Sequence, residues 1–582
     1  MASLRTSTFT SQDASLRSRS HFAADAIVLV AVAVILWLLI ELSHGITEPF
    51  NRVSAPSTVS TDPANLPYYA ARSLLRMFAA LAVSTVFTFL YATAAARLRR
   101  AEKILLPTLD ILQSVPVLGF LSITLTIWLT LFPGTALGVE LASIFAIFTS
   151  QVWNMTFAFY QSLVTQPRDL DEAARLLRLT KWQRFWKLDV PYGMIPLVWN
   201  GMMSFGGGWF FLIASEVISV NNHVYALPGI GSYVAAASQH QQIGRLLLAI
   251  AVMIVMVIGV NFLFWRPLTA WAERFRTGDT SSAEQQRSIV LDLVRRSVIP
   301  GMIARVLRPV GAGLEWATRP LGRADRPLRV NQARRRAGDI AFIVIVFALI
   351  ALGLARMLGY ISTTTGLDQF VVAAGLGLIT FGRVLVLLVV GTAVWVPIGV
   401  WIGLSPKVTR FAQPIVQVLA SFPANFLFPF FTLALIWSGV SLNVGGIFLM
   451  ALGAQWYILF NVIAGAAAIP NDLREAATNL RLNRVQKWRN LYGPAIFASW
   501  VTGGITAAGG AWNASIVAEV VSYGHTTLTA AGLGAYIAQS TADGDFGKTL
   551  VGVTVMSIFV VGLNRLFWRR LYDYAERRFS LT

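Results

Sequence analysis

The sequence lacks cysteine and has few histidines, and this limits the chemistry that it can carry. Its 582 residues include five histidines and no cysteine. Disulfide bonds, thiolate metal sites and cysteine nucleophiles are therefore excluded. The histidines are not clustered, so the sequence predicts no metal site, and it assigns no catalytic residue.

Charged residues are also scarce. They make up 13% of the chain, and 55% of the residues are hydrophobic; soluble domains carry about 25% charged residues. The apolar residues form runs of about 20, a length that crosses the hydrocarbon core of a bilayer as a helix. We therefore predict an all-α polytopic membrane protein that has the lipid bilayer as a partner.

The net charge of +19 has two readings. Basic chains include nucleic-acid-binding proteins, but membrane proteins also concentrate Lys and Arg in their cytoplasmic loops. Here Lys and Arg crowd the stretches 97–103 and 168–187, after the second and fourth apolar runs. The loops after runs one, three and five are poor in them. This pattern predicts cytoplasmic termini and no nucleic-acid partner.

The apolar runs predict about twelve transmembrane helices, six in each half. The first run is too long for a signal-peptide core and lacks a cleavage site, so we expect a retained span. Pro116 and Pro423 interrupt the third run of each half, and lipid tolerates such a break only against protein or a water-filled path. The predicted runs are 24–43, 70–96, 104–131, 137–163, 193–218, 245–265, 340–358, 374–403, 412–437, 443–468, 496–521 and 548–567.

The two sets of runs are copies of each other. Rare residues recur in register: at an offset of 303 residues Trp209 and Glu216 meet Trp512 and Glu519, and at an offset of 307 Arg76 meets Arg383. We infer a duplication and fusion, with a pseudo-two-fold axis along the membrane normal. The predicted parts are a cytoplasmic tail (1–23), a first six-helix repeat (24–275), a basic cytoplasmic linker (276–337) and a second six-helix repeat (338–582).

The linker contains two amphipathic, cationic stretches, 288–300 and 301–307. Helices of this kind often lie in the bilayer interface. We favour a tether between the repeats over a regulatory domain.

A polar, basic loop recurs in both repeats. Each copy has a Glu-Ala-Ala triplet, an arginine four residues after the second alanine of the triplet, and a terminal proline. The residues are Glu172, Ala173, Ala174, Arg178 and Pro191 in the first copy and Glu475, Ala476, Ala477, Arg481 and Pro494 in the second. These loops resemble the cytoplasmic coupling loop of ABC importer permeases, in which a glycine stands where this chain has Arg178 and Arg481. A glutamate near the start of a short helix favours the helix dipole, and Arg175 is spaced for an ion pair with Glu172.

The matched charged, tryptophan and proline positions of each repeat resemble the nitrate/taurine/sulfonate/bicarbonate subfamily of these permeases. Its members usually have one unit and form homodimers, so this chain resembles two fused permease domains of a type I importer. The resemblance implies two ABC ATPase subunits, a periplasmic or lipid-anchored substrate-binding protein, alternating access and a bacterial inner-membrane location. It also implies a small anionic substrate such as nitrate, a sulfonate or bicarbonate. No cofactor is expected on this chain, because ATP is bound by the partner subunits.

Four ionisable residues of the apolar runs are costly in a membrane unless they are paired or face a polar path. Arg76, Arg383, Glu216 and Glu519 are read either as a ring around the translocation path or outer gate, or as groups that snorkel or bond within the bundle. Trp209 and Trp512 join this candidate set, and packing is the favoured role for both tryptophans.

The sequence offers three other interpretations. The stretch 542–549 fits a loose phosphate-loop pattern, but it lies in a predicted periplasmic loop rather than between a strand and a helix, so ATP binding there is rejected. The chain is thus expected to be no enzyme. A secondary transporter with two parallel six-span repeats is the main alternative, and an exporter, which would lack the Glu-Ala-Ala loop, is the other.

Overall fold

The computed structural model describes residues 25–30, 33, 58–220, 223–275, 288–318, 322 and 332–579. The predicted tail 1–23 lies outside the described residues, and so does most of the predicted first span, 24–43.

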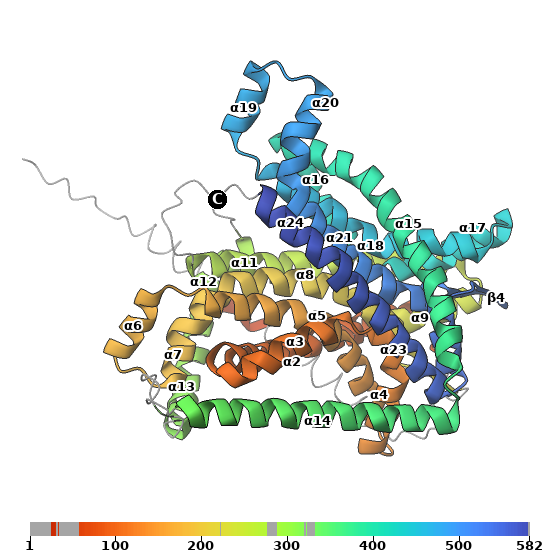
Figure 1. Cartoon of the computed structure of the whole chain (residues 1–582), viewed down its shortest axis with the longest axis horizontal. Helices are drawn as coiled ribbons and strands as arrows, with labels where there is room; N and C mark the ends of the chain where they lie inside the picture. The colour runs from red at the N-terminus through yellow and green to blue at the C-terminus, as the bar shows by residue number, and fades with distance from the viewer. Residues whose placement is uncertain are drawn as a thin grey trace, which may run out of the picture.

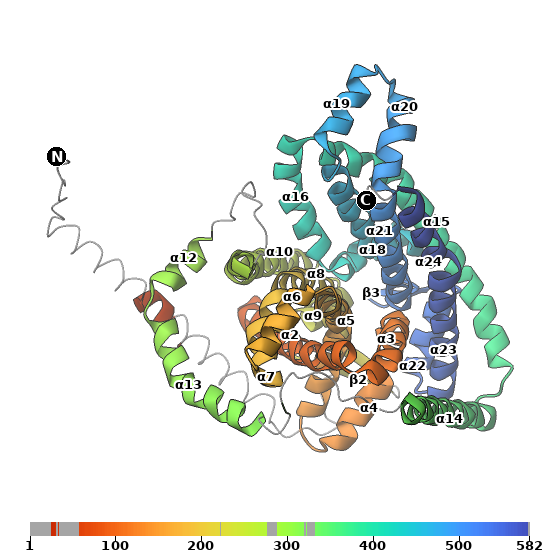
Figure 2. The ribbon, with the colours of Figure 1, turned by 60° about the vertical axis from the view of Figure 1, so that its left-hand side comes forward.

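The first half is a bundle of long helices with short helices at both of its ends (Figure 1). Its helices run nearly end-on in Figure 2 and therefore share a direction. Its elements are α2 (Leu66–Arg97), α3 (Arg99–Ser114), α4 (Leu121–Leu131), α5 (Leu137–Val164), α6 (Arg168–Leu176), α7 (Lys181–Arg184), α8 (Val190–Glu216), β1 (Val217–Val220), β2 (His223–Ala226), α9 (Ile230–Gln239), α10 (Ile243–Val260) and α11 (Arg266–Ala272).

The second half repeats the same order of elements. Its elements are α14 (Gln332–Thr364), α15 (Gln369–Leu404), α16 (Pro406–Ser421), α17 (Phe428–Ser438), α18 (Leu442–Ala467), α19 (Asn471–Asn479), α20 (Arg484–Lys487), α21 (Gly493–Ala518), β3 (Val520–Tyr523), β4 (Thr526–Thr529), α22 (Leu533–Ala542), α23 (Phe546–Leu563) and α24 (Arg569–Phe579). The helices from α15 onward correspond one by one to those from α2 onward.

The described residues include eight helices that are long and apolar enough to cross a membrane, or nine if the bent pair α16–α17 forms one span. Helix α5 packs between α2 and α8, and α18 packs in the same way between α15 and α21. The buried apolar side chains form two large clusters, one mainly in each half, and each cluster also includes residues of the other half. The structure is thus an all-α polytopic protein with tandem repeats, as predicted.

The third predicted run of each half is broken rather than continuous. In the first half the 3₁₀ turn η2 (Val117–Phe120) separates α3 from α4, and in the second η7 (Ala424–Leu427) precedes α17. Pro116 and Pro423 stand just before these turns with extended backbone, because proline cannot donate the amide hydrogen bond that a continuous helix needs. The two parts of the second-half run are bent by 79°.

Each broken run reaches into the other half. The backbone amide of Val117 donates to Asn513 Oδ1 in α21 (3.1 Å), and Asn425 Nδ2 donates to the carbonyl oxygen of Phe210 in α8 (3.1 Å). Position 513 is the equivalent of 210 at the offset of 303 residues. These reciprocal bonds place the two breaks on either side of a pseudo-two-fold axis.

Short antiparallel β-hairpins, which the sequence did not predict, follow α8 and α21. Val217 pairs with Ala226 in β1–β2, and Val520 pairs with Thr529 in β3–β4. We call the end of the molecule that carries these hairpins the hairpin end. The opposite end of each half, which carries α6–α7 or α19–α20, is called the loop end.

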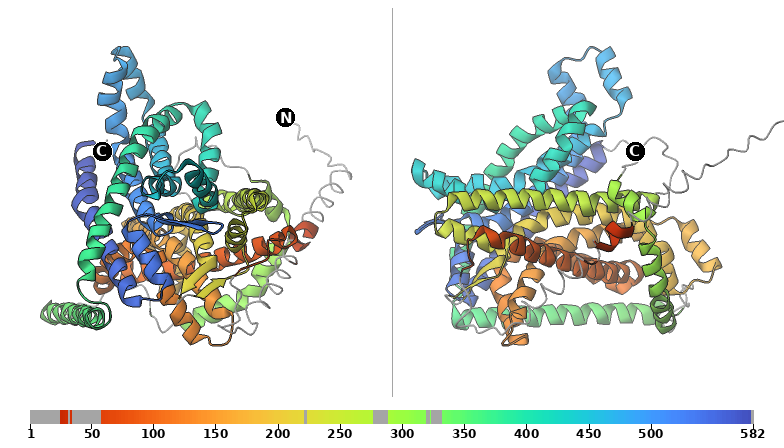
Figure 3. Two further views of the ribbon diagram at one scale, coloured as in Figure 1. Left: turned by 90° about the vertical axis from the view of Figure 1, so that its right-hand side faces the viewer. Right: turned by 180° about the vertical axis from the view of Figure 1, so that it is seen from behind.

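The linker forms α12 (Ile289–Arg296) and α13 (Ile299–Thr318), so its second helix is longer than predicted. Figures 1 and 3 show α13 running across the direction of α14 at the loop end of the first half.

Candidate coupling loops and translocation path

Both Glu-Ala-Ala loops project from their halves, as α6–α7 and α19–α20 (Figures 1 and 2). Glu172, Ala173, Glu475 and Ala476 are exposed, whereas Ala174 and Ala477 are buried against the loop. Each loop also exposes a leucine at the same position, Leu177 at 71% and Leu480 at 72%. A projecting helix pair with small and apolar exposed residues offers a surface on which another protein can dock.

The turn after each triplet has a left-handed residue. Arg178 and Arg481, which occupy the glycine position of the resembled family, have φ angles of 50° and 49°. The amides of Leu179 and Leu482 reach back to the carbonyls of Ala174 and Ala477 (3.1 Å in both loops). This is the Schellman arrangement that usually ends in glycine, so the loop keeps its turn although arginine replaces the favoured residue.

The helix after each turn begins with a capping box. The side chains and backbone of Thr180 and Gln183 bond reciprocally, and Asn483 and Gln486 do so in the second loop. These caps were missed, although Thr-x-x-Gln and Asn-x-x-Gln are readable signals of a helix start.

Pro191 and Pro494 lie one residue inside α8 and α21, each following a five-residue π-helical segment, η3 (Phe185–Asp189) or η8 (Trp488–Tyr492). The prolines thus lie in the first turn of α8 and α21, and each of these helices continues directly from the π-helical segment before it. A π-helical segment shifts the hydrogen-bond register where a proline cannot donate.

The two loops are held by different interactions. In the first, Asp171 bonds to Arg175 and Arg184 (2.5 Å each), and Asp189 bonds to Arg97 (2.6 Å). Arg175 therefore pairs with Asp171 and not with Glu172, whose exposed side chain stays available. The equivalents of Asp171 and Asp189 are Arg474 and Tyr492, and Arg474 Nη2 donates to the carbonyl oxygen of Leu404.

A buried ionic cluster ties together the hairpin end of the first half. Arg76 makes two bonds to Glu140 (2.6 and 2.7 Å) and one to Glu216 (2.7 Å), and Arg72 also bonds to Glu140. All four side chains are at most 3% exposed. Because these residues come from α2, α5 and α8, the cluster locks three spans together.

The second half has a smaller version of this cluster. Arg383 bonds to Glu519 (2.7 Å), and its remaining nitrogens donate to oxygens of Asn443 and Ala531. Asn443 is the equivalent of Glu140, and Ile379 is the equivalent of Arg72. The second half therefore replaces an ion pair of the first half with two uncharged side chains.

The glutamate of each cluster also holds the segment after the hairpin. Glu216 accepts bonds from Ser73 Oγ (2.5 Å) and the amide of Gly231 (2.6 Å). Glu519 accepts bonds from Thr380 Oγ1 (2.8 Å) and the amide of Ala535 (3.1 Å). A Cβ on Gly229 would lie 2.2–2.4 Å from the Glu216 carboxylate, and on Gly532 it would lie 2.3–2.5 Å from that of Glu519. The glycines following the glutamates are thus required for this close approach.

Three cavities lie along the contact between the halves. A central cavity of about 200 Å³ is bordered by both proline breaks, by α5, α8, α18 and α21, and by the side chains of Trp456 and Tyr457. A second cavity, of about 990 Å³, shares Gln113, Asn154 and Ile505 with it and extends to the loop end, where Thr165 and Tyr192 line it. The central space therefore continues toward the loops.

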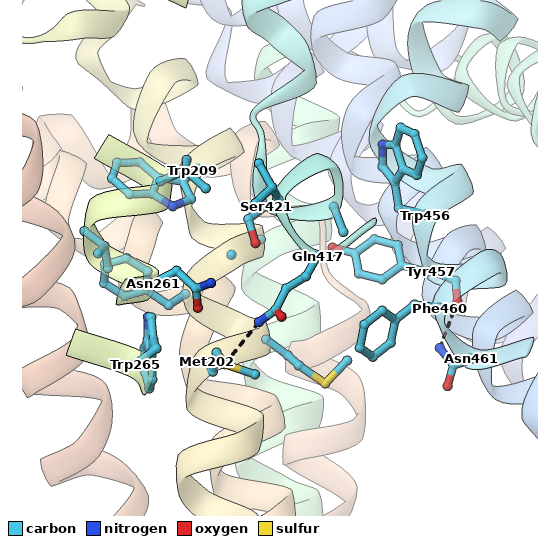
Figure 4. A pocket seen from close by; sticks show the side chains of 18 residues that line it. Met202, Trp209, Asn261, Trp265, Gln417, Ser421, Trp456, Tyr457, Phe460 and Asn461 are labelled. Atoms are coloured by element: carbon cyan, nitrogen blue, oxygen red, sulfur yellow. Dashed lines mark hydrogen bonds between the residues drawn. The ribbon is translucent and has the colours of Figure 1, made fainter. Parts of the chain in front are cut away.

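The third cavity, of about 70 Å³, lies between α8 and η4 (Asn261–Trp265) on one side and α16 and α18 on the other (Figure 4). Gln417 Nε2 approaches Met202 Sδ (3.4 Å) across it. In the part of the chain that the structure describes, none of the residues lining these three cavities is charged; their polar side chains are amides, hydroxyls and indoles.

The predicted path residues occupy a different place from the cavities. Arg76, Glu216, Arg383 and Glu519 line none of the three and are bonded within their own bundles. Trp209 borders the third cavity but is 1% exposed, and Trp512 packs with Phe381 and Phe559. This arrangement matches the alternative in which these groups bond within the bundle.

The hairpin end is closed by contacts between the halves. Strand β1 packs against α22, and β3 packs against α9. The amide of Gly524 donates to the carbonyl oxygen of Ser238 (3.1 Å), and Ser238 Oγ donates to that of Ser522 (3.4 Å). Among the described residues the two halves therefore meet at the hairpin end, and the cavities extend toward the loop end.

Two related helical bundles around a shared cavity, each with an exposed loop at one end, define a multi-pass membrane transport protein. Residues 84–277 and 395–581 both match the family model "Binding-protein-dependent transport system inner membrane component". The chain belongs to this family and contains its domain twice, which confirms the predicted fusion of two units.

Named relatives match roughly a third of the chain. It is 27% identical over 205 residues to the nitrate import permease protein NrtB of a Synechocystis species, covering 35% of this chain and 69% of the relative. Over 135 residues it is 27% identical to the bicarbonate transport system permease protein CmpB of Synechococcus elongatus, covering 23% and 45%. Over 192 residues it is 26% identical to the putative aliphatic sulfonates transport permease protein SsuC of Bacillus subtilis, covering 31% and 66%.

Proposed function

We propose that this chain is the membrane-spanning permease of an ATP-driven importer. The observation that carries this proposal is the pair of projecting loops with the same Schellman turn, exposed glutamate and exposed leucine. A separate ATPase subunit would dock on each loop, with Glu172 and Glu475 facing it. ATP-driven approach of the two motor subunits would then move α5 and α8 against α18 and α21.

The cavities support a conformation that is open toward the motor. The loop end is the cytoplasmic end in this proposal, which follows from the placement of Lys and Arg. The hairpin end would accept a substrate-binding protein from outside. The solute would pass through the central cavity, whose amides and hydroxyls can bond to a small anion without charged side chains. The names of the relatives support nitrate, bicarbonate or a sulfonate as the substrate class.

The predicted path residues Arg76, Arg383, Glu216 and Glu519 would serve the outer gate without touching the solute. Each glutamate fixes the segment that follows its hairpin, and the hairpins close the hairpin end. We propose that the Arg76 and Arg383 clusters keep the gate hairpins attached to the bundles, with Trp209 and Trp512 packing beside them.

Uptake into proteoliposomes tests this function. The chain is reconstituted with its ATPase and binding protein, and labelled anions are supplied outside with ATP inside and no ion gradient. We expect uptake that depends on both ATP and the binding protein. Uptake that follows a proton or sodium gradient without ATP would instead support a secondary transporter.

The coupling role has its own matched test. Glu172→Ala with Glu475→Ala should weaken ATPase binding about tenfold or more, the effect of losing about 1.4 kcal/mol. Asp169→Ala with Asp472→Ala is the control, because these residues are exposed carboxylates at equivalent positions of the same two helices. Unchanged ATPase co-purification and uptake in the glutamate variant would refute the coupling role.

A further inference from the structure

Helix α13 of the linker has an apolar face that no other element covers among the described residues. Met302, Val306, Val310 and Leu314 recur every four residues and are 56%, 73%, 57% and 47% exposed. Residues at this spacing lie on one side of a helix. An isolated apolar stripe of this kind needs a partner that excludes water.

The opposite face of α13 is polar and already has a partner in the first coupling loop. Arg305, Arg308 and Glu315 lie on this side by the helical period. Glu315 Oε1 accepts a bond from Gln183 Nε2 of α7 (2.5 Å). Just beyond the helix, the carbonyl oxygen of Gly322 accepts a bond from the amide of Lys181 (3.2 Å). The apolar face therefore points away from the loop.

The direction of α13 fits a helix lying flat on a bilayer. Figures 1 and 3 show it across α14, and in Figure 2 it is seen lengthwise while α14 is seen end-on. Helix α12 packs on α11, which continues the membrane-capable helix that begins at Ile243. Helix α14, itself membrane-capable, follows the linker. The chain thus holds α13 close to the membrane surface at both of its ends.

The charge of the linker fits an acidic surface. Within 288–318 there are four arginines, at 295, 296, 305 and 308, and two acidic residues, Asp292 and Glu315. One of these acids is engaged with Gln183. Cationic amphipathic helices bind bilayers by burying an apolar face among the acyl chains while basic side chains meet anionic headgroups.

We propose that α13 lies in the membrane interface on the loop side, with Met302, Val306, Val310 and Leu314 in the acyl region and its arginines at acidic lipid headgroups. The helix would then couple the lipid surface to the first coupling loop through the Gln183–Glu315 bond. That the loop side faces the cytoplasm rests on the proposed function, but the lipid contact itself does not.

The absence of cysteine allows single-site labelling of the full chain. Val306→Cys, Val310→Cys and the opposite-face control Arg308→Cys are spin-labelled and placed in nanodiscs of phosphatidylcholine, with and without phosphatidylglycerol. Accessibility to oxygen and to a water-soluble nickel chelate is measured by electron paramagnetic resonance. We expect the oxygen-to-nickel ratio at 306 and 310 to exceed that at 308 several-fold, and to rise further with phosphatidylglycerol.

Equal, water-like accessibility at all three sites in both kinds of nanodisc would overturn the proposal. The proposal would also be overturned if the labels at 306 and 310 were shielded from the nickel chelate in detergent only after the ATPase is added. The apolar face would then be covered by protein and not by lipid. Arg305→Gln with Arg308→Gln should remove the response to phosphatidylglycerol, and a response that persists would refute the role of acidic headgroups. Because none of these measurements uses transport, a failure here is separate from a failure of uptake.

Discussion

The buried clusters of the two halves share one design and differ at one ion pair. Both halves hold a glutamate at the end of the long helix before the hairpin, bonded to an arginine, a hydroxyl and a backbone amide. The first half adds Arg72 and Glu140, where the second has Ile379 and Asn443. The difference removes one positive and one negative charge together, so each buried cluster stays neutral.

This difference shows which part of the cluster each half needs. The bond between arginine and the hairpin glutamate is common to both, and so is the glycine that lies against the carboxylate. The added pair is optional as a pair, but each member is required while the other remains, because an unmatched charge in a buried site costs far more than a missing pair.

The largest expected effect comes from splitting that pair. Arg72→Ile or Glu140→Asn alone leaves one unbalanced charge and should cost about 3–5 kcal/mol of stability. The double variant Arg72→Ile with Glu140→Asn reproduces the second half and should recover most of the loss. Melting followed by tryptophan fluorescence in detergent measures all three variants. Additive losses in the double variant would show that the two halves are not equivalent at this site.

The sequence predicted the shared part of the cluster but not the added pair. Arg76, Glu216 and their equivalents were found because they recur in register. Glu140 and Arg72 were missed because this pair is present in one half only and therefore does not recur in register. Their signal was available, since Glu140 is a carboxylate within a predicted span and Arg72 lies one helical turn before Arg76.

Other features depended on three-dimensional contacts. The prolines predicted where the third run of each half breaks, but not that each break would contact the opposite half through Asn513 or Asn425. The left-handed turn could not be predicted from Arg178 and Arg481, because arginine has no preference for positive φ. The hairpins follow the long helices in short stretches whose β-pairing depends on packing against α9 and α22.

The next effect should be equal in both halves. Gly229→Ala and Gly532→Ala place a methyl group against a buried, fully bonded carboxylate and should each cost about 1–3 kcal/mol, as overpacking does. Gly259→Ala and Gly562→Ala are equivalent helical controls with nothing within 4 Å of the added Cβ. The same melting measurement compares the four variants. A loss of stability confined to one half would show that the same contact between glycine and glutamate contributes differently to the stability of the two halves.

A smaller effect should separate the coupling loops. Asp171→Ala removes its ion pairs with Arg175 and Arg184 and should cost about 1 kcal/mol, because Asp171 and Arg175 are partly exposed. The equivalent Arg474→Ala removes a bond to the carbonyl of Leu404 instead, with no loss of an ion pair. Raising the salt concentration should therefore shrink the effect of Asp171→Ala on the melting temperature while leaving that of Arg474→Ala unchanged. Equal salt dependence of the two variants would contradict the conclusion that different interactions hold the two loops.

The smallest expected change is a gain in stability at the turns. Arg178→Gly and Arg481→Gly relieve a left-handed backbone that disfavours residues with a Cβ. The added freedom of glycine in the unfolded chain opposes this gain, so we expect a net stabilisation of about 0.5 kcal/mol in each loop. If the melting temperature rises while ATPase binding falls, the arginines are retained for contact with the motor and not for the turn. If ATPase binding is unchanged, the geometry of the Schellman turn is what binding requires at this position. The two turns are then equivalent, although different interactions hold the two loops.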